Sequence, residues 1–438
     1  MKKILCVLLL LAMTVTLISC NVINVSDNTS KTEEAKTDRN AIKIEGLSTD
    51  QQTLLQDLAS EWDSIGVSSE SDFRLRQYDF ALKLYRAFTI TSENKNVMLS
   101  PLSIQLALAM AANGAKGETK SEMEQFLGGV SIDQLNNDLN SFVKKLPSSN
   151  NYKLGIANSI WGRNGAVDIK ESFINTNKSF YNAELYSEPF DNSTVEKINN
   201  WVSENTDKMI DRIIDDISPD DVLHLINAII FDAKWASTID EFSIREGEFT
   251  AIDGKKKTVE MMHTEEYEYI ITDDAVGFVK PYKDKKYSFV GILPNEDVPI
   301  NDYIESLDAA KLCDILDNIQ SGLSAISFPK FEYEYEIDMT PLLCAMGMST
   351  AFTSGADFTD MATSSLGNIY ISSVRHKTYI SVDNEGTRAA AVTDITCKAT
   401  AAPTYKLTAT FDRPFVYMII ENETKLPIFI GTVMDIGE

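Results

Sequence analysis

The segment from Ser381 to Pro403, SVDNEGTRAAAVTDITCKATAAP, constrains the fold most, because its residues alternate in character with a period of two. From Thr387 onward the odd-numbered positions are small or apolar and uncharged. Every charge of this stretch stands at an even-numbered position: Arg388, Asp394 and Lys398. Such alternation predicts a strand with one buried and one solvated face. The alanine run at 389–391 has a low strand propensity and offers little to hold it in place. We interpret the segment as a strand that enters a sheet late.

Helical and strand patterns are segregated along the chain. Apolar residues at helical spacing predict helices over 49–66, from Phe73 to Phe88, 103–112, 130–145, 171–181, 194–214 and 299–317. Strand patterns occupy 153–162, 225–235, 256–271, 277–293, 325–337, 369–382 and 404–433. Helices crowd the first half and strands the second, which predicts an α+β fold rather than alternating α/β. No linker divides the body in two.

The first 46 residues have the character of an export signal and a stalk. Residues 1–19 carry two lysines and a short apolar stretch, which predicts a secretory signal peptide. The end of this stretch, Leu17 to Cys20, resembles the lipobox of bacterial lipoproteins. Lipidation at Cys20 would tether the protein to the outside of the bacterial cell, whereas an ordinary signal would leave it secreted. Residues 20–46 are rich in polar residues and predict a flexible stalk. Residues 47–69 are expected to form an extra helical segment.

The residue inventory argues against most catalytic and nucleic-acid functions. The formal net charge of −25 disfavours a nucleic-acid partner. Only three histidines are present, and no GxSxG, HExxH, GxxxxGK[ST] or GxGxxG string occurs. We therefore expect no enzyme activity, no metal and no cofactor.

Several long blocks of the sequence resemble the serpin family. NEGTRAAAVT (384–393) resembles the hinge of the serpin reactive-centre loop, and FDRPFVYMIIENETKLPIFIGTV (411–433) resembles the strands that follow it. Four further blocks agree in order and spacing, at 96–123, 225–235, 327–361 and 371–387. The resemblance covers residues 70–438, which we take as a serpin domain.

The resemblance implies a fold and a mechanism. The serpin fold has a large central β-sheet with two further sheets, about eight to nine helices and an exposed reactive-centre loop, here at about 385–405. A serpin of this kind is an irreversible suicide inhibitor of serine proteases: the loop is cleaved, the acyl-enzyme is trapped, and the loop inserts into the central sheet. Two alternatives remain open. One is a non-inhibitory serpin-fold binding protein. The other is an inhibitor of trypsin-like serine proteases, through Lys398, or of papain-like cysteine proteases.

Site residues follow from the resemblance residue by residue. The loop hinge comprises Glu385, Gly386, Thr387, Arg388, Ala389, Ala390, Ala391, Val392 and Thr393. Counting fourteen residues from the hinge glycine gives the reactive bond Thr400 to Ala401, which suits an elastase-like protease. Counting back from 411–415 gives a site about three residues later, so the register is open and Ala399 and Ala402 remain alternative reactive residues. For a trypsin-like enzyme the alternative reactive residue is Lys398. A hydrogen-bonded cluster behind the sheet, the shutter, maps onto Ser100, Ser103, Asn227 and His376, and the aromatic of the breach at the sheet top maps onto Trp235.

Two departures limit what is carried over from the family. Asn384 stands where many inhibitors have an acidic residue, which puts a sheet-top salt bridge in doubt. The region of the heparin-binding helix offers only Lys144 and Lys145, which argues against heparin-type activation. We expect a monomer that meets a membrane only through its N-terminal lipid.

Overall fold

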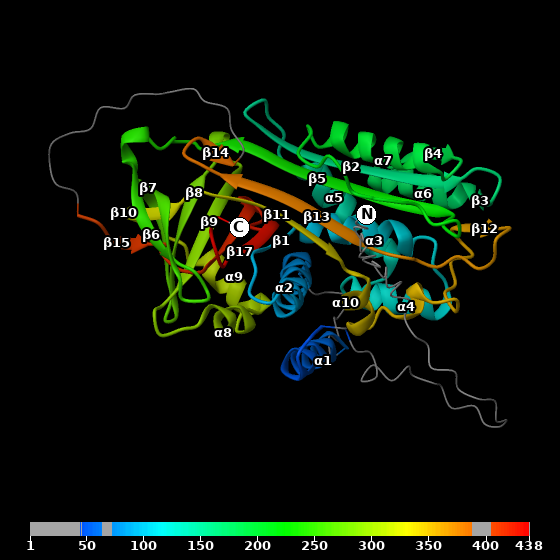
Figure 1. Cartoon of the computed structure of the whole chain (residues 1–438), viewed down its shortest axis with the longest axis horizontal. Helices are drawn as coiled ribbons and strands as arrows, with labels where there is room; N and C mark the ends of the chain where they lie inside the picture. Colours follow the sequence, from blue (N-terminus) through cyan, green and yellow to red (C-terminus); the bar gives the residue numbers. More distant parts are fainter. Residues whose placement is uncertain (1–43, 45, 64–71, 388–403, 438) are drawn as a thin grey trace, which may run out of the picture. The chain divides into compact units, whose positions relative to one another are not determined.

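Helices lie mainly in the first half of the chain and strands in the second (Figure 1). The computed structural model describes residues 44, 46–63, 72–387 and 404–437, all within the unit that spans 39–438. The α-helices within these ranges are α1 (Thr49–Asp63), α2 (Phe73–Thr91), α3 (Pro101–Ala112), α4 (Gly117–Phe126), α5 (Ile132–Lys145), α6 (Glu171–Tyr181), α7 (Asn192–Asn205), α8 (Ile300–Glu305), α9 (Ala309–Asp317) and α10 (Thr340–Ala345). This is more than the eight to nine helices that the resemblance implies; α8 and α10 are the shortest, with six residues each.

The strands form three sheets, and the fold is α+β. The six-stranded sheet has the order β11 (Phe331–Asp338), β13 (Arg375–Val382), β14 (Gly386–Thr387), β5 (Leu223–Lys234), β2 (Tyr152–Arg163) and β4 (Glu184–Glu188). The nine-stranded sheet has the order β1 (Val97–Leu99), β17 (Pro427–Val433), β16 (Phe415–Glu421), β9 (Tyr287–Pro294), β8 (Ala275–Pro281), β7 (Lys256–Ile271), β10 (Gln320–Pro329) and β15 (Leu407–Thr410), with β6 (Ile244–Thr250) also paired to β7. The third sheet pairs β12 (Ala362–Ser364) with β3 (Val167–Ile169).

Several expected elements end earlier or divide. The helix expected over 194–214 ends at Asn205, where the Thr206 hydroxyl donates to the carbonyl of Val202 and caps the last turn. The helix expected over 299–317 divides into α8 and α9, because the Asp308 side chain accepts a hydrogen bond from the Lys311 backbone and starts a new helix. The strand expected over 325–337 divides at Lys330, and its two parts, β10 and β11, belong to different sheets. Likewise, the strand expected over 277–293 turns back at Lys283–Lys285 to give β8 and β9.

The six-stranded sheet is covered on both faces around β5. Alternate residues of β5 point in opposite directions: Ala228 and Ile226 pack with the apolar side of α7, while Phe231 and Ala233 belong to the main core. Figure 1 shows α7 on one face of this sheet and α3 on the other. The two large sheets meet at Tyr333 of β11, whose hydroxyl lies 2.6 Å from that of Tyr417 of β16. The β5 side of the sheet is therefore buried on both faces, whereas the outward face of β11 is exposed at Glu332, Glu334 and Glu336.

No helix in the described part of the chain is both long enough and apolar enough to cross a membrane.

Candidate functional site

The hinge residues form a tight turn at the top of the six-stranded sheet. The Asp383 side chain accepts hydrogen bonds from the backbone N–H groups of Glu385 and Gly386, at 2.7 and 3.0 Å. A Cβ at Gly386 would lie 2.2 Å from the carbonyl oxygen of Ala233, so only glycine allows this close approach to β5. The turn directs the chain from β13 into the space beside β5.

The two residues of β14 occupy a place between β5 and β13. Thr387 pairs antiparallel with Ala233 of β5 and with Val382 of β13. In the described residues β5 is paired only to β2 and β14, and β13 only to β11 and β14. Adjacent strands lie about 4.8 Å apart, so β5 and β13 are separated by the width of one strand here. β14 is the start of a strand in the middle of the sheet.

Thr387 lies in a dry aromatic pocket, where it is 3 % exposed. Its hydroxyl is 2.5 Å from the hydroxyl of Tyr282, which is completely buried. Burial holds the pKa of Tyr282 far above its usual value, so the phenol stays neutral and hydrogen-bonded to Thr387. The Tyr282 ring stacks on Trp235 with 4.5 Å between ring centroids.

Trp235 closes this pocket from above. Its indole N–H donates to the carbonyl of Asp383 at 2.8 Å, and its backbone N–H donates to the carbonyl of Glu385. The expected breach aromatic is thus in direct contact with the hinge turn. It ties the top of β5 to the point at which the chain enters the sheet.

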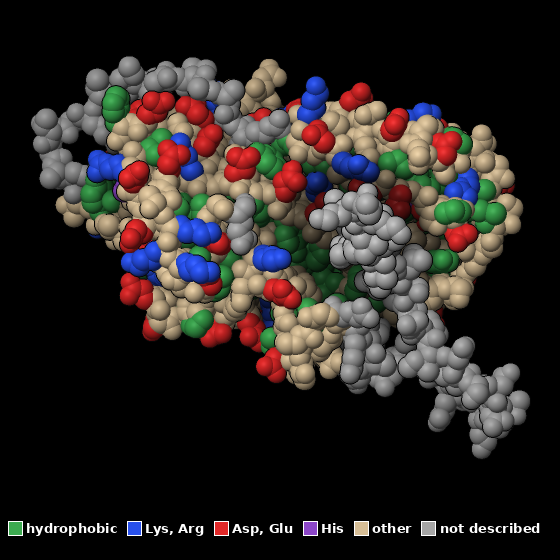
Figure 2. All heavy atoms as spheres, viewed as in Figure 1, with side chains coloured by type: hydrophobic (Ala, Val, Ile, Leu, Met, Phe, Trp, Pro, Cys, Tyr) green, Lys and Arg blue, Asp and Glu red, His purple; other side chains and the backbone are tan. Residues whose placement is uncertain are grey.

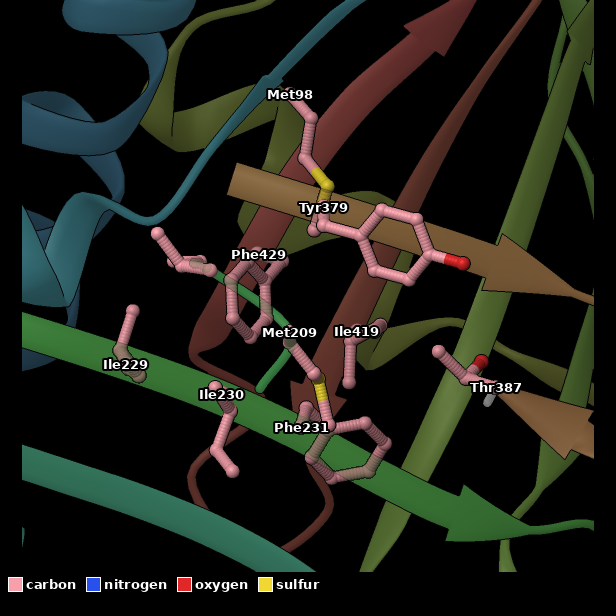
Figure 3. Close-up of a pocket in the computed structure, with 10 residues that line it drawn as sticks. Met98, Met209, Ile229, Ile230, Phe231, Tyr379, Thr387, Ile419 and Phe429 are labelled. Atoms are coloured by element: carbon pink, nitrogen blue, oxygen red, sulfur yellow. The ribbon is translucent and has the colours of Figure 1, made fainter. Parts of the chain in front are cut away.

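A small cavity of about 10 Å³ lies just below Thr387, which is space for about one water molecule (Figure 3). Phe231 and Ile230 of β5 line one side, and Tyr379 of β13 lines the other. Met209, from the segment that follows α7, extends into the space between them (Figure 3). Ile419 and Phe429, from β16 and β17, form the floor. The space below β14 is therefore apolar and nearly filled by side chains.

The expected shutter residues divide into two hydrogen-bonded groups. On the β5 side, the Ser103 hydroxyl donates to the Asn227 side chain, which in turn donates to Asn158 of β2 at 2.7 Å. On the β13 side, the ring Nε2 of His376 accepts from the Ser100 backbone at 3.2 Å. Ser100 caps α3, because its hydroxyl accepts from the Ser103 backbone N–H. The start of α3 therefore contacts both halves of the sheet.

His376 is neutral in this environment. Complete burial lowers the pKa of its imidazole to about 3, because the charged form would lose its hydration. A neutral ring is also what the contact requires, since Nε2 accepts a hydrogen bond.

A sheet-top ion pair is present, but it does not use the hinge. Lys280 of β8 and Glu266 of β7 form a buried pair at 2.6 Å, and the Lys280 ammonium lies 5.4 Å from the Trp235 ring. Asn384 contributes only its backbone carbonyl, which accepts from the Ile239 N–H at 2.9 Å. An acidic side chain at position 384 is therefore not needed to hold this turn.

The remaining predicted site residues lie outside the described part of the chain: Arg388, Ala389, Ala390, Ala391, Val392, Thr393, Lys398, Ala399, Thr400, Ala401, Ala402 and Cys20. Sequence reasoning missed Tyr282, Asp383, Met209 and Asn158. Asp383 carried a weak signal, since an aspartate shortly before a glycine is typical of side-chain-capped turns. The other three are ordinary strand or loop residues in the sequence.

The two residues of β14 begin a strand between β13 and β5 of the six-stranded sheet. The family model described as "Serpin (serine protease inhibitor)" matches residues 76–436, and the chain belongs to the serpin family. An uncharacterized serpin-like protein of Thermococcus kodakarensis is 32% identical over 365 residues, covering 81% of this chain and 84% of the relative. Serpin B6 of Macaca fascicularis is 33% identical over 377 residues, covering 80% and 96%.

Solved structures agree with this assignment. Native tengpin, a thermophilic serpin, is 43% identical with a TM-score of 0.79, covering 84% of this chain and 96% of that one. Its latent state gives a TM-score of 0.74 at 42% identity, covering 85% and 100%. Thyroxine-binding globulin in complex with thyroxine is also similar, at 26% identity and a TM-score of 0.74, covering 83% and 99%. The family is described as serine protease inhibitors, and it also has a thyroxine-binding globulin among its similar structures.

Proposed function

We propose that this protein is an irreversible suicide inhibitor of serine proteases with elastase-like preference. The observation that carries the proposal is β14: Gly386 and Thr387 already occupy a strand position between β5 and β13. Cleavage of the loop would free residues 388–400 to extend this strand. The new strand would complete two ladders and bury one face, and this free energy would trap the acyl-enzyme.

The register of β14 supports this mechanism on the buried face. Continued along β5, this register would bring Ala389, Ala391 and Thr393 opposite Phe231, Ile229 and Asn227 in turn. Continued along β13, it would bring the same three residues opposite Ile380, Thr378 and His376. The β13 partners in this series, and Phe231 and Ile229, are buried. Small uncharged side chains are what such positions accept.

The same register supports the proposal on the solvated face. Arg388 would lie opposite Asp232 of β5, and Asp394 opposite Arg375 of β13. Both pairs have opposite charges, and cross-strand pairs of opposite charge stabilise a sheet by roughly 0.2–1 kcal/mol each. Two of the three charged positions of the segment, Arg388 and Asp394, are thus matched to partners in the proposed inserted state.

Incubation with a pancreatic-type elastase, with trypsin and with papain tests the proposal on one denaturing gel. An inhibitor gives an SDS-stable complex with elastase, whereas a non-inhibitory serpin gives only a cleaved band. A complex with trypsin or papain alone would replace the elastase assignment. Thr400→Arg is expected to lose elastase inhibition and gain trypsin inhibition, because a small apolar pocket rejects a charge that a buried carboxylate favours. Lys398→Ala is the matched control and should leave elastase inhibition intact.

We further propose that the chain is exported, lipidated at Cys20 and displayed on the bacterial surface. The lipobox-like Leu17 to Cys20 and the polar stretch to residue 46 support this proposal. Labelled palmitate should enter the wild type but not Cys20→Ser.

We expect a monomer before the protein meets a protease. A similar serpin, 41% identical, is known as a loop C-sheet polymer, so the oligomeric state should be measured by size-exclusion chromatography.

A further inference from the structure

Met209 differs from the other methionines in the described part of the chain, because it alone among them is not buried. The chain has 14 methionines, of which Met1 and Met13 lie outside the described residues. Eleven of the remaining twelve are at most 3 % exposed. Met209 is partly exposed, in the turn that follows α7. An oxidant that attacks thioethers from the solvent would therefore reach Met209 before the eleven others.

The turn that carries Met209 is held in a strained conformation against the sheet. Asp207 and Lys208 have positive φ values of 47° and 60°, a conformation that costs a non-glycine residue free energy. The Met209 backbone N–H donates to the carbonyl of Thr206 at 2.8 Å. Lys153 of β2 forms an ion pair with Asp207 at 2.5 Å. These contacts hold the turn so that the Met209 side chain points into the sheet.

The Met209 side chain lies in the space between β5 and β13 (Figure 3). Together with Ile230 of β5 and Tyr379 of β13 it lines the cavity below Thr387, of which only about 10 Å³ is open. No ladder joins β5 directly to β13 in the described residues. Met209 therefore occupies part of the space that a longer strand between β5 and β13 would need.

The register of β14 shows what the Met209 side chain excludes. If β14 were three residues longer, Ala390 would lie opposite Ile230 of β5 and Tyr379 of β13. These are two of the residues between which Met209 lies. Successive residues of a strand face opposite sides of the sheet, so Ala390 would face the α7 side, from which Met209 enters. The strand can therefore lengthen past Ala389 only if the Met209 side chain withdraws.

We propose that Met209 is an oxidation-sensitive plug of the sheet: a hydroperoxide converts its thioether to the sulfoxide, which withdraws and lets β14 lengthen in the uncleaved protein. This inference rests on the proposed function, because the lengthened strand is the one that would trap the acyl-enzyme. In the reaction the sulfur lone pair attacks one oxygen of hydrogen peroxide, and the O–O bond breaks. The sulfur loses two electrons and keeps that oxygen, while the other oxygen leaves as water with the proton of the first.

The surroundings of Met209 favour the thioether over the sulfoxide. A sulfoxide is polar, and a polar group that is buried without a hydrogen-bond partner is less stable than in water. The cavity is lined by apolar groups apart from the hydroxyls of Thr387 and Tyr379. The first hydroxyl lies 2.5 Å from that of Tyr282, and the second donates to Glu332 at 2.6 Å. The oxidised side chain is therefore more stable in the solvent than in the space between the strands.

Charge over the molecule favours an uncharged oxidant. Acidic side chains are spread over the face in view in Figure 2, and the formal net charge of the chain is −25. Such a field repels anions over long range but leaves neutral hydrogen peroxide unaffected. The oxidised protein would lose inhibitory activity, because part of its loop would be in the sheet before a protease arrives.

The test treats the uncleaved wild type, Met209→Leu and Met209→Gln with hydrogen peroxide, in the absence of any protease. Met209→Leu keeps an apolar side chain of similar size that takes up no oxygen, whereas Met209→Gln places a polar side chain in the plug from the start. Peptide mapping by mass spectrometry measures oxygen uptake at position 209. The melting temperature reports the lengthened strand, because added ladder hydrogen bonds stabilise the sheet.

Peroxide should oxidise Met209 before the other described methionines, and the high-melting form of the wild type should then appear at least about tenfold faster than without peroxide. Met209→Leu should stay in the low-melting form at the same dose, and Met209→Gln should convert without peroxide. A Met209→Leu variant that converts as fast as the wild type would overturn the plug.

Unoxidised wild type that has been cleaved in the loop separates failure of the plug from failure of the proposed function. A cleaved protein that melts high, beside an oxidised uncleaved protein that does not, would refute the plug alone. A cleaved protein that melts no higher than the uncleaved one would refute the inserted strand, and with it the proposed function.

Discussion

Thr387→Arg is the sharpest test of hinge insertion, because the wild-type contacts of this residue are explicit. The native side chain is 3 % exposed, and its hydroxyl pairs with the Tyr282 hydroxyl at 2.5 Å. Tyr282 and Trp235 enclose it, and the cavity beneath it holds about one water molecule. An arginine at this position would find no room for its hydration shell.

The magnitude follows from that enclosure. An uncompensated buried charge costs about 3–5 kcal/mol, and the unpartnered Tyr282 hydroxyl adds about 1–3 kcal/mol. The lower figure for the charge alone corresponds to more than a 100-fold change in an equilibrium or a rate. Thr387 is buried in β14 before cleavage, so the substituted hinge is expected to leave the sheet in the uncleaved protein and must be buried on insertion. Since acyl-enzyme hydrolysis competes with insertion, a 100-fold slower insertion converts an inhibitor that acts one to one into a substrate consumed many times per enzyme.

The assay titrates a fixed amount of elastase with wild type, Thr387→Arg and the control Thr53→Arg. Thr53 lies exposed on α1, so the control adds the same charge without burying it. The expected result is a stoichiometry near one for wild type and control, and above ten for Thr387→Arg, with a cleaved band in place of the complex. A stoichiometry of one for Thr387→Arg would refute insertion of the hinge.

Three further predictions address the inserted strand, its charges and the shutter. Cleavage within Ala399 to Ala402 by a non-target protease should raise the melting temperature by about 10 °C or more, because the loop adds a strand with its ladder hydrogen bonds; an equal or lower value would mean that the loop stays out. Arg375→Glu places an acid opposite Asp394 in the proposed inserted state, so it should raise the stoichiometry of inhibition. Arg375→Glu/Asp394→Arg restores opposite charges and should return the stoichiometry to the wild-type value; a double variant with the same stoichiometry as the single one would show that the register is different. His376→Gln should flatten the pH dependence of unfolding. The pKa of His376 is about 3 in the native state and about 6.5 in the unfolded state, so only the unfolded state binds a proton between these values. The free energy of unfolding of the wild type therefore falls as the pH drops below 6.5, by about 2 kcal/mol between pH 6.5 and 5. Equal slopes in denaturant titrations of both proteins would contradict the neutral buried ring.

The fold class and the hinge were predictable because their signals are local. Helices and strands segregate along the sequence. The segment after Thr387 lies outside the described residues, so the strand that its period-two alternation predicts stays a prediction. The sheet positions of that segment's neighbours were not predictable, because they depend on contacts distant in sequence. Tyr282 lies 105 residues before Thr387, yet its hydroxyl is the direct partner of the hinge. Nothing in the sequence near either residue signals this pairing.

The extra divisions of helices and strands have a similar cause. Thr206 and Asp308 interrupt continuous apolar patterns through hydrogen bonds of their side chains to the nearby backbone. Lys330 joins two strands of one continuous pattern, but its backbone N–H bonds to Glu260 and the chain then passes to the other sheet. A pattern of apolar residues records burial, and it does not record which sheet the strand joins.

The shutter residues lie on both sides of the line along which the sheet would part in the proposed mechanism. The line of parting runs between β5 and β13, and the Ser103–Asn227–Asn158 hydrogen bonds all lie on the β5 side, while the His376–Ser100 bond lies on the β13 side. Because Ser100 and Ser103 both belong to the start of α3, separation of the two strands would have to release one of these two groups from α3. In the proposed inserted state, Thr393 arrives opposite both Asn227 and His376, where its hydroxyl can donate to one group and accept from the other. A valine at position 393 has nearly the same shape and no hydroxyl, so Thr393→Val should lower the melting temperature of the cleaved form and leave that of the uncleaved form unchanged.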